Sequence, residues 1–303
     1  MHSAIAKAAA LIEAHRYIQR FKDKIVVVKV GGSIQEDDER MCALLTDVAF
    51  MSGVGIRPVL VHGGGKSITR AMDEAGIKAR FIQGRRYTDR ATLEIAERVL
   101  VNDCNKFLVD NLNASGSRAI ALHSLGSCVL LADRMSLPDP ATGKPLDLGY
   151  VGTVSQVNTV LLTALCEDGY VPVIAPVAMA RPSDSAKPDP DSIGKLNVNA
   201  DTAAGHVAAA LKAEKLVVLS DTHGIRVDPD KADSYASALT HSQIDALVRS
   251  GVIGEGMLPK VESCVIALNA GVPKAHIIDG RIPHSLLLEI YTDEGIGTQI
   301  TLG

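Results

Sequence analysis

Short runs of β-branched residues alternate with longer stretches of helical periodicity through most of this chain. Because the runs are apolar throughout, they are typical of strands buried on both faces of a parallel sheet. The expected strands are Ile25–Val30, Val59–Val61, Val171–Ile174, Leu216–Leu219 and His276–Ile278. The stretches between them suit crossover helices, and these are Arg40–Met51, Ser67–Ala75, Asp89–Asn113, Val157–Glu167, Ala200–Ala213, Ser242–Ser250 and Val261–Ala270. The alternation predicts an α/β fold, a three-layer α-β-α sandwich around a mainly parallel sheet.

Two segments break the alternation. Arg118–Val154 carries several prolines between short apolar runs, which favours β-hairpins over the edge of the sheet. Arg181–Gly194 is polar and rich in proline, and we expect a surface loop there, near the passage from a first lobe to a second. The predicted organisation is therefore an N-terminal helix over residues 1–23, a first lobe over 24–195 and a second lobe over 196–303.

The composition indicates an ordinary soluble protein that acts on small molecules. With 47% hydrophobic and 22% charged residues, a chain of this length can bury a sizeable core. No apolar run reaches the ~20 residues that span a bilayer, and the start of the chain lacks the uninterrupted apolar segment of a signal peptide. We expect an unprocessed, cytoplasmic protein with no membrane role. A net charge of -4 and the absence of Trp leave no basic surface or stacking platform for nucleic acid. Five cysteines without paired spacing favour reduced thiols over disulfides or a metal site.

Two glycine turns follow two neighbouring strands. Lys29 ends the first strand and Gly31-Gly32 follow it, which puts an ammonium group and exposed backbone amides at the edge where α/β proteins bind ligands. The second strand runs into His62-Gly63-Gly64-Gly65-Lys66-Ser67 and a helix, whose first amides favour an anion. Leu60 stands where a Walker A loop needs a glycine, so this is not such a loop. A solvated lysine and a tight turn without ligand are the alternatives for each turn alone; together the turns indicate paired anion sites.

Polar residues near two helix starts are further candidates. Arg86 precedes a helix whose cap is Thr88 or Asp89, and its guanidinium could clamp a carboxylate in two places. It could equally be a surface arginine. Asn197 and Asp201 lie in the segment that opens a later helix of small residues, where helix capping explains one of the polar side chains but not all of them.

Two later turns suit a nucleotide. Ser220, Asp221 and Gly224 follow an expected strand, in a polar turn that fits ribose and phosphates. Gly254 opens a glycine-rich loop that leads to Lys260 at a helix start, although this lysine taken alone reads as a surface residue.

In order along the chain, these segments resemble the amino-acid kinase superfamily and, within it, the N-acetylglutamate kinases. The resemblance runs from about Ala9 to Gly303. It rests on VVVKVGGS, VLVHGGGKSI, GRRYTD, DLGYVGTV, VPVIAPVA, LNVNADTAA, GMLPKVESC and AHIIDGRIPHSLLLEIYTDEGIGTQI. The first two stretches indicate the superfamily, whereas the Arg86 segment, NVNAD and the C-terminal run are more specific.

The resemblance implies ATP-dependent phosphorylation of the side-chain carboxylate of N-acetyl-L-glutamate, with Mg²⁺ carried by the nucleotide and no metal site of the protein. It implies that Lys29 and Lys260 flank the transferring phosphoryl group and that Asp201 holds both ammonium groups. The implied binding residues are Gly64, Gly65, Arg86 and Asn197 for the acid in the first lobe, and Gly31, Gly32, Ser220, Asp221, Gly224 and Gly254 for ATP, mainly in the second. The chemistry agrees, because a carboxylate with a pKa of about 4.3 is already ionised and needs no general base.

The resemblance also implies regulation. The N-terminal helix carries an apolar stripe with Ile12, Ile18 and Phe21, and such a helix accompanies feedback inhibition by L-arginine and a homohexamer built as a trimer of dimers. The matching arginine-site residues are Lys215, His276, Glu294 and Gly297. The alternative is that the helix packs on its own subunit. A PII-type regulator is a further partner that the resemblance leaves open.

Two other functions stay open at this point. A sibling kinase could act on carbamate, aspartate, glutamate or a carrier-bound aminoadipate. A catalytically silent arginine-sensing module could share the scaffold, although the presence of Lys29, Asp201 and Lys260 argues against it.

Overall fold

The computed structural model describes residues 2–31, 38–139, 142–181, 194–254, 256–292 and 295–303. In this part of the chain, the main sheet has eight strands in the order β14-β16-β15-β13-β1-β2-β10-β5. In that order their bounds are Ala238–Thr240, Gly297–Thr301, Ala275–Asp279, Lys215–Ser220, Ile25–Val30, Arg57–His62, Val171–Ile174 and Ala119–Leu122. Neighbouring strands pair in parallel except for β15 with β16. The five predicted strands are confirmed, and all five lie side by side in the sheet, as β15-β13-β1-β2-β10.

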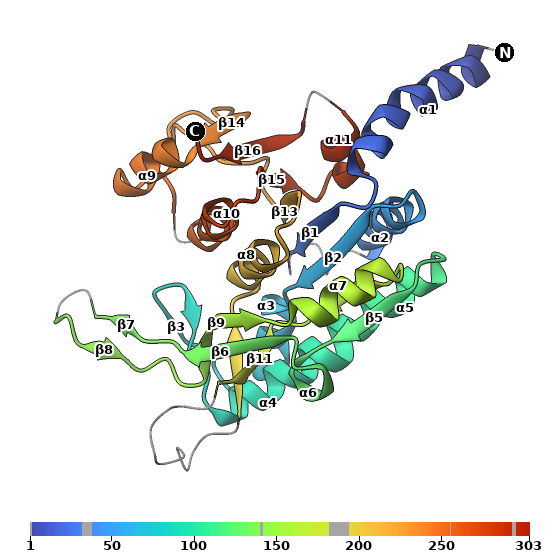
Figure 1. Ribbon diagram of the computed structural model, residues 1–303. Helices are drawn as coiled ribbons and strands as arrows, with labels where there is room; N and C mark the ends of the chain where they lie inside the picture. Colours follow the sequence, from blue (N-terminus) through green and yellow to red (C-terminus); the bar gives the residue numbers. More distant parts are fainter. Residues whose placement is uncertain (1, 32–37, 140–141, 182–193, 255, 293–294) are drawn as a thin grey trace.

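Helices cover both faces of this sheet (Figure 1). On one face lie α7 (Thr159–Glu167), α8 (Ala200–Leu211), α9 (His241–Arg249) and α10 (Leu258–Asn269). On the other lie α2 (Asp38–Gly53), α5 (Lys106–Ala114) and α11 (Ser285–Tyr291). Alternate residues of β1 enter the two cores, with Val27 in the first and Val26 and Val28 in the second. The predicted three-layer sandwich is confirmed.

The helix predicted over Asp89–Asn113 contains a π-helical segment. It consists of α4 (Arg90–Arg98), η1 (Val99–Asn105) and α5, and Asp89 caps its start by accepting a hydrogen bond from the Thr92 amide at 2.8 Å. The buried Asn105 donates from Nδ2 to the Val173 carbonyl of β10 at 2.9 Å. Wide π turns of this kind cluster at functional sites, and this one packs beneath the first turn of α3 (Gly65–Glu74).

A small closed barrel stands beside the main sheet. Its strands are β6 (Leu130–Arg134), β9 (Val151–Val157), β11 (Val177–Ala180) and β12 (Lys195–Val198), and the hairpin of β7 (Leu137–Pro138) and β8 (Pro145–Leu146) projects from it. The short helix α6 (Ser124–Ser127) precedes β6.

The hairpins expected over Arg118–Val154 are thus present in its later part. The prediction is wrong for the start of the segment, which forms no hairpin. Strand β5 instead joins the main sheet, where it pairs in parallel with β10. Its four residues continue the alternation of strands and helices, and the prolines later in the segment hide this strand in the sequence. The loop expected over Arg181–Gly194 connects β11 to β12; residues 182–193 lie outside the described residues, and the division into lobes stays a prediction.

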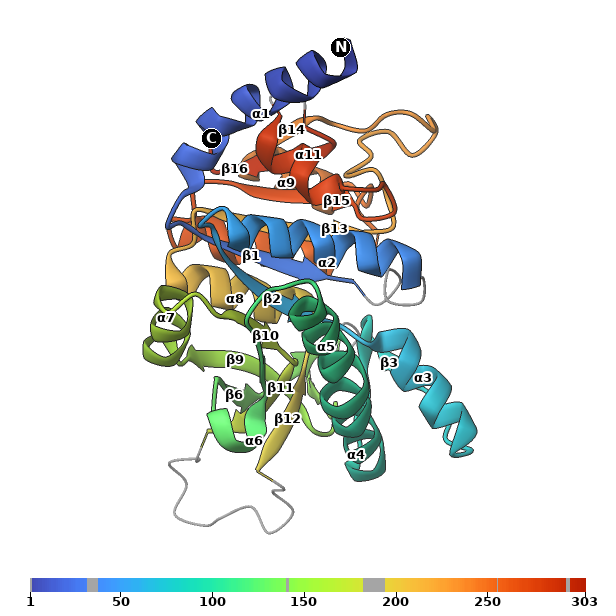
Figure 2. The same cartoon turned by 90° about the vertical axis from the view of Figure 1, so that its right-hand side faces the viewer.

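The expected N-terminal helix is α1 (His2–Phe21). Its last turns pack on the body of the molecule, where Tyr17 and Phe21 are buried near Tyr291. Earlier in the helix, Leu11 is 70% exposed and Ile12 is 75% exposed. Figures 1 and 2 show this part of α1 extending beyond the other layers. Of the predicted apolar stripe, Phe21 therefore packs into the chain's own core, whereas Ile12 does not. In the described part of the chain, no helix is both long and apolar enough to cross a membrane.

Candidate active site

Three elements bring a buried ion pair to the carboxyl edge of the sheet. Lys29 lies near the end of β1, between Val218 of β13 and Val61 of β2. Its Nζ is 2.8 Å from Oδ1 of Asp201, and the two side chains are 6% and 11% exposed. Asp201 is held in the first turn of α8, whose cap Asn199 accepts hydrogen bonds from the Asp201 and Thr202 amides at 2.9 and 3.1 Å.

A second lysine faces the same carboxylate. Burial alone would raise the pKa of Asp201, but the charges of Lys29 and Lys260 outweigh it and hold that pKa below its usual range. Burial lowers the pKa of Lys260, with Asp201 opposing the shift and Lys29 reinforcing it. Two ammonium groups thus act on one aspartate, which is the arrangement that the resemblance implies.

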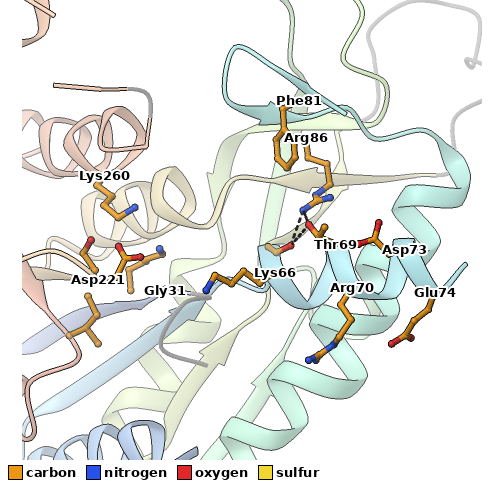
Figure 3. Close-up of a pocket in the computed structure, with 14 residues that line it drawn as sticks. Gly31, Lys66, Thr69, Arg70, Asp73, Glu74, Phe81, Arg86, Asp221 and Lys260 are labelled. Carbon is orange, nitrogen blue, oxygen red and sulfur yellow. Dashed lines mark hydrogen bonds between the residues drawn. The ribbon is translucent and has the colours of Figure 1, made fainter. Parts of the chain in front are cut away.

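A cavity of about 770 Å³ opens in front of this cluster (Figure 3). Its lining residues are Lys29, Gly31, Gly65, Lys66, Thr69, Arg70, Asp73, Glu74, Phe81, Arg86, Leu219, Ser220, Asp221 and Lys260. A cavity of about 230 Å³ adjoins it and is lined by Gly64, Asn197 and Asp201 among others. Lys29, Gly65, Phe81 and Arg86 line both. Most of the predicted site residues therefore meet at one place, which has a larger and a smaller compartment.

The glycine turn between the compartments depends on a close approach. A Cβ on Gly64 would lie 2.8 Å from Cδ2 of Leu100 and 3.3 Å from Sγ of Cys104, and both of these residues belong to η1. Gly64 precedes α3 and has no side chain to cap that helix, so its first amides remain available to an anion. The π segment therefore packs closely against Gly64, and a side chain at this position would require Leu100 to shift.

Arg86 is held in place by neighbours that sequence reasoning missed. Its Nη2 donates to the Gly65 carbonyl and to Oγ1 of Thr69, each at 2.8 Å (Figure 3). Its guanidinium carbon lies 4.9 Å from the centre of the Phe81 ring, and burial lowers its pKa. Arg86 belongs to β4 (Arg85–Arg86), which pairs with β3 (Phe81–Ile82). Thr69 and Phe81 gave no signal in the sequence, because their meeting with Arg86 depends on this hairpin folding back over α3.

The nucleotide residues predicted after β13 are only partly in the cavity. Ser220 and Asp221 line it, whereas Gly224 closes a turn with φ of 134°, where a Cβ would lie 2.5 Å from Oγ1 of Thr298. Gly254 lies outside the lining of both compartments, and its carbonyl accepts from the Met257 amide at 2.9 Å in the turn that leads to α10. Gly32 lies outside the described residues.

A separate cavity of about 380 Å³ lies at the opposite edge of the sheet, and it is lined by Lys215, His276 and Gly297, which the resemblance implies as arginine-site residues. Glu294 lies outside the described residues. Among the described residues, a buried carboxylate that lines this cavity is Glu289 of α11, with Oε1 at 2.6 Å from Nδ1 of His276 and 3.3 Å from Nζ of Lys215. Burial raises the pKa of Glu289, but His276 and Lys215 outweigh it and lower that pKa. A glutamate inside the apolar run SLLLEIY is the sequence signal that could have identified this buried carboxylate.

Comparison with known proteins decides the family. The model of the amino acid kinase family matches residues 24–279. This chain belongs to the amino acid kinase family. The acetylglutamate kinase of Methanothrix thermoacetophila is 45% identical to it over 295 residues, which is 97% of this chain and 98% of the relative. The acetylglutamate kinase of Symbiobacterium thermophilum is 43% identical over 297 residues, 98% of each chain.

Solved structures agree with this family assignment. The N-acetylglutamate synthase of Neisseria gonorrhoeae, in complex with coenzyme A and N-acetyl-glutamate, superposes with a TM-score of 0.81 at 26% identity. The match covers 97% of this amino acid kinase but 63% of the synthase, so this chain spans less than two thirds of that protein. Carbamate kinase from Giardia shares the fold, with a TM-score of 0.63 at 14% identity.

Proposed function

We propose that this amino acid kinase is an acetylglutamate kinase of arginine biosynthesis, which transfers the γ-phosphoryl group of ATP to the side-chain carboxylate of N-acetyl-L-glutamate. The observation that carries the proposal is the Lys29–Asp201–Lys260 cluster between a larger and a smaller compartment. The names of relatives at 43–45% identity over nearly the full chain supply the acid.

The proposed mechanism needs positioning and positive charge, and no protein base. The acid lies in the smaller compartment, where the Gly64 and Gly65 turn, Arg86 and Asn197 hold its carboxylates and amide. The triphosphate lies in the larger compartment beside Gly31, Ser220 and Asp221, with Mg²⁺ supplied by the nucleotide. The ionised acceptor carboxylate attacks the γ-phosphorus while the bond to the β,γ-bridging oxygen breaks. Lys29 and Lys260 neutralise charge on the equatorial oxygens.

A coupled assay of ADP release tests this function. We expect turnover with MgATP and N-acetyl-L-glutamate to exceed that with carbamate, aspartate, glutamate and a carrier-bound aminoadipate by at least about tenfold in kcat/KM, since buried polar groups without a partner penalise the wrong acid. A faster reaction with one of the other acids overturns the substrate. Absence of turnover with every acid would make the chain a binding module instead.

We further propose that L-arginine inhibits the enzyme from the 380 Å³ cavity. Glu289 is a buried carboxylate that could pair with a guanidinium in two places, and Lys215 could receive the effector's carboxylate. Tyr17, Arg20 and Phe21 of α1 line the same cavity, so a ligand there contacts the helix whose exposed half is proposed to join subunits into a homohexamer. We place this enzyme in the cytoplasm, and a PII-type partner stays open.

A further inference from the structure

A second arginine faces the compartment proposed for the acid. Arg85 lies directly before Arg86 in β4, and its side chain is 15% exposed. It lines the 230 Å³ cavity, whereas it does not line the 770 Å³ cavity. Arg85 is therefore placed beside the proposed site of the acid rather than that of the triphosphate.

One terminal nitrogen of Arg85 is anchored and the other is not. Its Nη2 donates to Oε2 of Glu262 in α10 at 3.3 Å. Its Nη1 is buried and has no hydrogen-bond partner in the part of the chain that the structure describes. A buried donor without a partner is destabilising, and a ligand in the compartment that Arg85 lines would supply the missing acceptor.

The anchor at Glu262 is held by close helix packing. The next residue, Ser263, lies against α8, where a Cβ on Gly205 would be 2.6 Å from the Ser263 carbonyl oxygen. The two helices therefore meet at backbone distance, which fixes the part of α10 that carries Glu262. Glu262 is itself 47% exposed, so water screens its charge and leaves the buried end of the Arg85 guanidinium positive.

The neighbouring Arg86 has few donors left for the acid. Its Nη2 donates to the Gly65 carbonyl and to Oγ1 of Thr69, which takes up both hydrogens of that nitrogen. Its Nη1 donates to Sδ of Met72 at 3.2 Å. At most Nε and one hydrogen of Nη1 remain for a ligand. A carboxylate bound in this compartment thus gains a further donor from Arg85.

We propose that Arg85 is a further binding residue for the acid: Nη1 donates to the carboxylate that does not react, while Glu262 holds Nη2. This inference rests on the proposed function. The reacting carboxylate must face the γ-phosphoryl group, and Arg85 does not line the cavity proposed for the triphosphate. Arg85 therefore acts on binding and selection of the acid, which lowers KM without changing kcat.

The test pairs a change in the protein with a change in the ligand. The α-carboxamide of N-acetyl-L-glutamate keeps the reacting carboxylate and has a neutral group in place of the other. Calorimetry in the presence of MgADP, which prevents turnover, measures binding of both compounds to the wild type and to Arg85→Met. The variant should bind N-acetyl-L-glutamate about tenfold or more weakly, but the carboxamide no more than about threefold more weakly. Equal losses for the two compounds would overturn the proposal.

Two control variants separate substrate binding from a tie between the hairpin and α10. Glu262→Ala breaks the tie but keeps the guanidinium, so the KM for the acid should rise by no more than about threefold. Arg80→Met removes an exposed arginine just before the hairpin that lines neither compartment, and it should follow the wild type. Arg85→Met should raise that KM about tenfold or more and keep kcat within about threefold. A rise in Glu262→Ala as large as that in Arg85→Met would overturn the proposal.

The outcomes also separate this inference from the proposed function. If the wild type neither binds nor turns over N-acetyl-L-glutamate, the proposed function fails. The same comparison with the preferred acid of the panel and its amide then decides the role of Arg85. A wild type that binds none of the acids would overturn both.

Discussion

At the scale of single residues, the two lysines of the active site differ in how much the fold depends on them. Lys29 is 6% exposed and 2.8 Å from the buried Asp201, whereas Lys260 is half-buried and donates to the Gly256 carbonyl at 3.2 Å. A buried carboxylate that loses its close partner is costly, but the loss of a more distant cation is not. The same proposed chemistry should thus have different structural consequences at the two positions.

Lys29→Ala and Lys260→Ala should each lower kcat by about 10²-fold or more, because each removes positive charge from the moving phosphoryl group. Only Lys29→Ala should also lower the free energy of unfolding, by about 3 kcal/mol. Lys260→Ala should cost no more than about 1 kcal/mol. Steady-state kinetics and urea unfolding check both, with Lys24→Ala, an exposed change just before β1, as the control. Near-normal kcat in either variant would contradict the assignment.

His62 makes the stability of the fold sensitive to acid. It is fully buried, and burial lowers its pKa to about 4, with the Gly63 carbonyl at 3.1 Å from Nδ1 opposing the shift. Between that pKa and the ordinary 6.5, the unfolded chain binds a proton that the folded chain does not. Stability therefore falls as the pH is lowered through this window.

We predict that lowering the pH from 7 to 5 costs the wild type about 2 kcal/mol of unfolding free energy through His62 alone. His62→Asn should be less stable than the wild type at pH 7. On acidification to pH 5, however, its unfolding free energy should fall by about 2 kcal/mol less than that of the wild type. Urea unfolding at both pH values measures the difference, and His15→Asn on the exposed surface of α1 should follow the wild type. Equal losses in the wild type and His62→Asn would show that another group carries the pH dependence.

At the scale of elements, the start of α8 is both a structural cap and part of the site. Asn199 accepts hydrogen bonds from the Asp201 and Thr202 amides, so the cap fixes the backbone that carries the shared aspartate. Capping alone accounted for one polar residue of this segment in the sequence, and the structure assigns the cap to Asn199. Asn197 lines the smaller compartment and donates from Nδ2 to Oγ1 of Thr88 at 3.2 Å.

Asn199→Ala should cost about 1 kcal/mol of stability and should also lower kcat several-fold, because Asp201 loses its fixed position. Thr240→Ala is the matched control: Thr240 caps α9 with a reciprocal bond to Gln243 and lies outside both compartments. It should cost similar stability and leave kcat unchanged. If both variants lose activity in proportion to stability, Asn199 is only a cap.

Much of this arrangement was readable from the sequence at the level of elements. Continuous apolar runs identified the central strands, and glycines after β1 and β2 identified the ligand edge, because both signals are local. The π segment and its contact with Gly64 were not readable, since they depend on how a helix crosses a turn some forty positions earlier. Glu289 was missed for a related reason: its partners Lys215 and His276 come from two other strands.

At the scale of the whole molecule, one strand joins the two sites. β13 begins at Lys215 in the 380 Å³ cavity and ends at Ser220 in the 770 Å³ cavity. Among the residues that the structure describes, α1 lines the first of these cavities, through Tyr17, Arg20 and Phe21, and not the second. Under the proposed regulation, an effector at the Lys215 edge would act on the active site through β13 and on the proposed neighbouring subunits through α1.

Removal of residues 2–14 separates the two roles of α1. It deletes Leu11 and Ile12, which are exposed, and keeps Tyr17 and Phe21, which are buried in the core, so the remaining enzyme should fold and keep its basal kcat. We expect the wild type to be a hexamer with sigmoidal inhibition by L-arginine, and the truncated enzyme to be a dimer without it, because exposed apolar residues on a projecting helix need a partner surface. Light scattering and an arginine titration measure the two properties.

Glu289→Gln is the complementary control: it should lose inhibition but stay hexameric, since it changes the cavity and leaves the exposed half of α1 intact. A truncated enzyme that remains hexameric would remove α1 from assembly, and an active wild type that ignores millimolar arginine would remove the effector from this cavity.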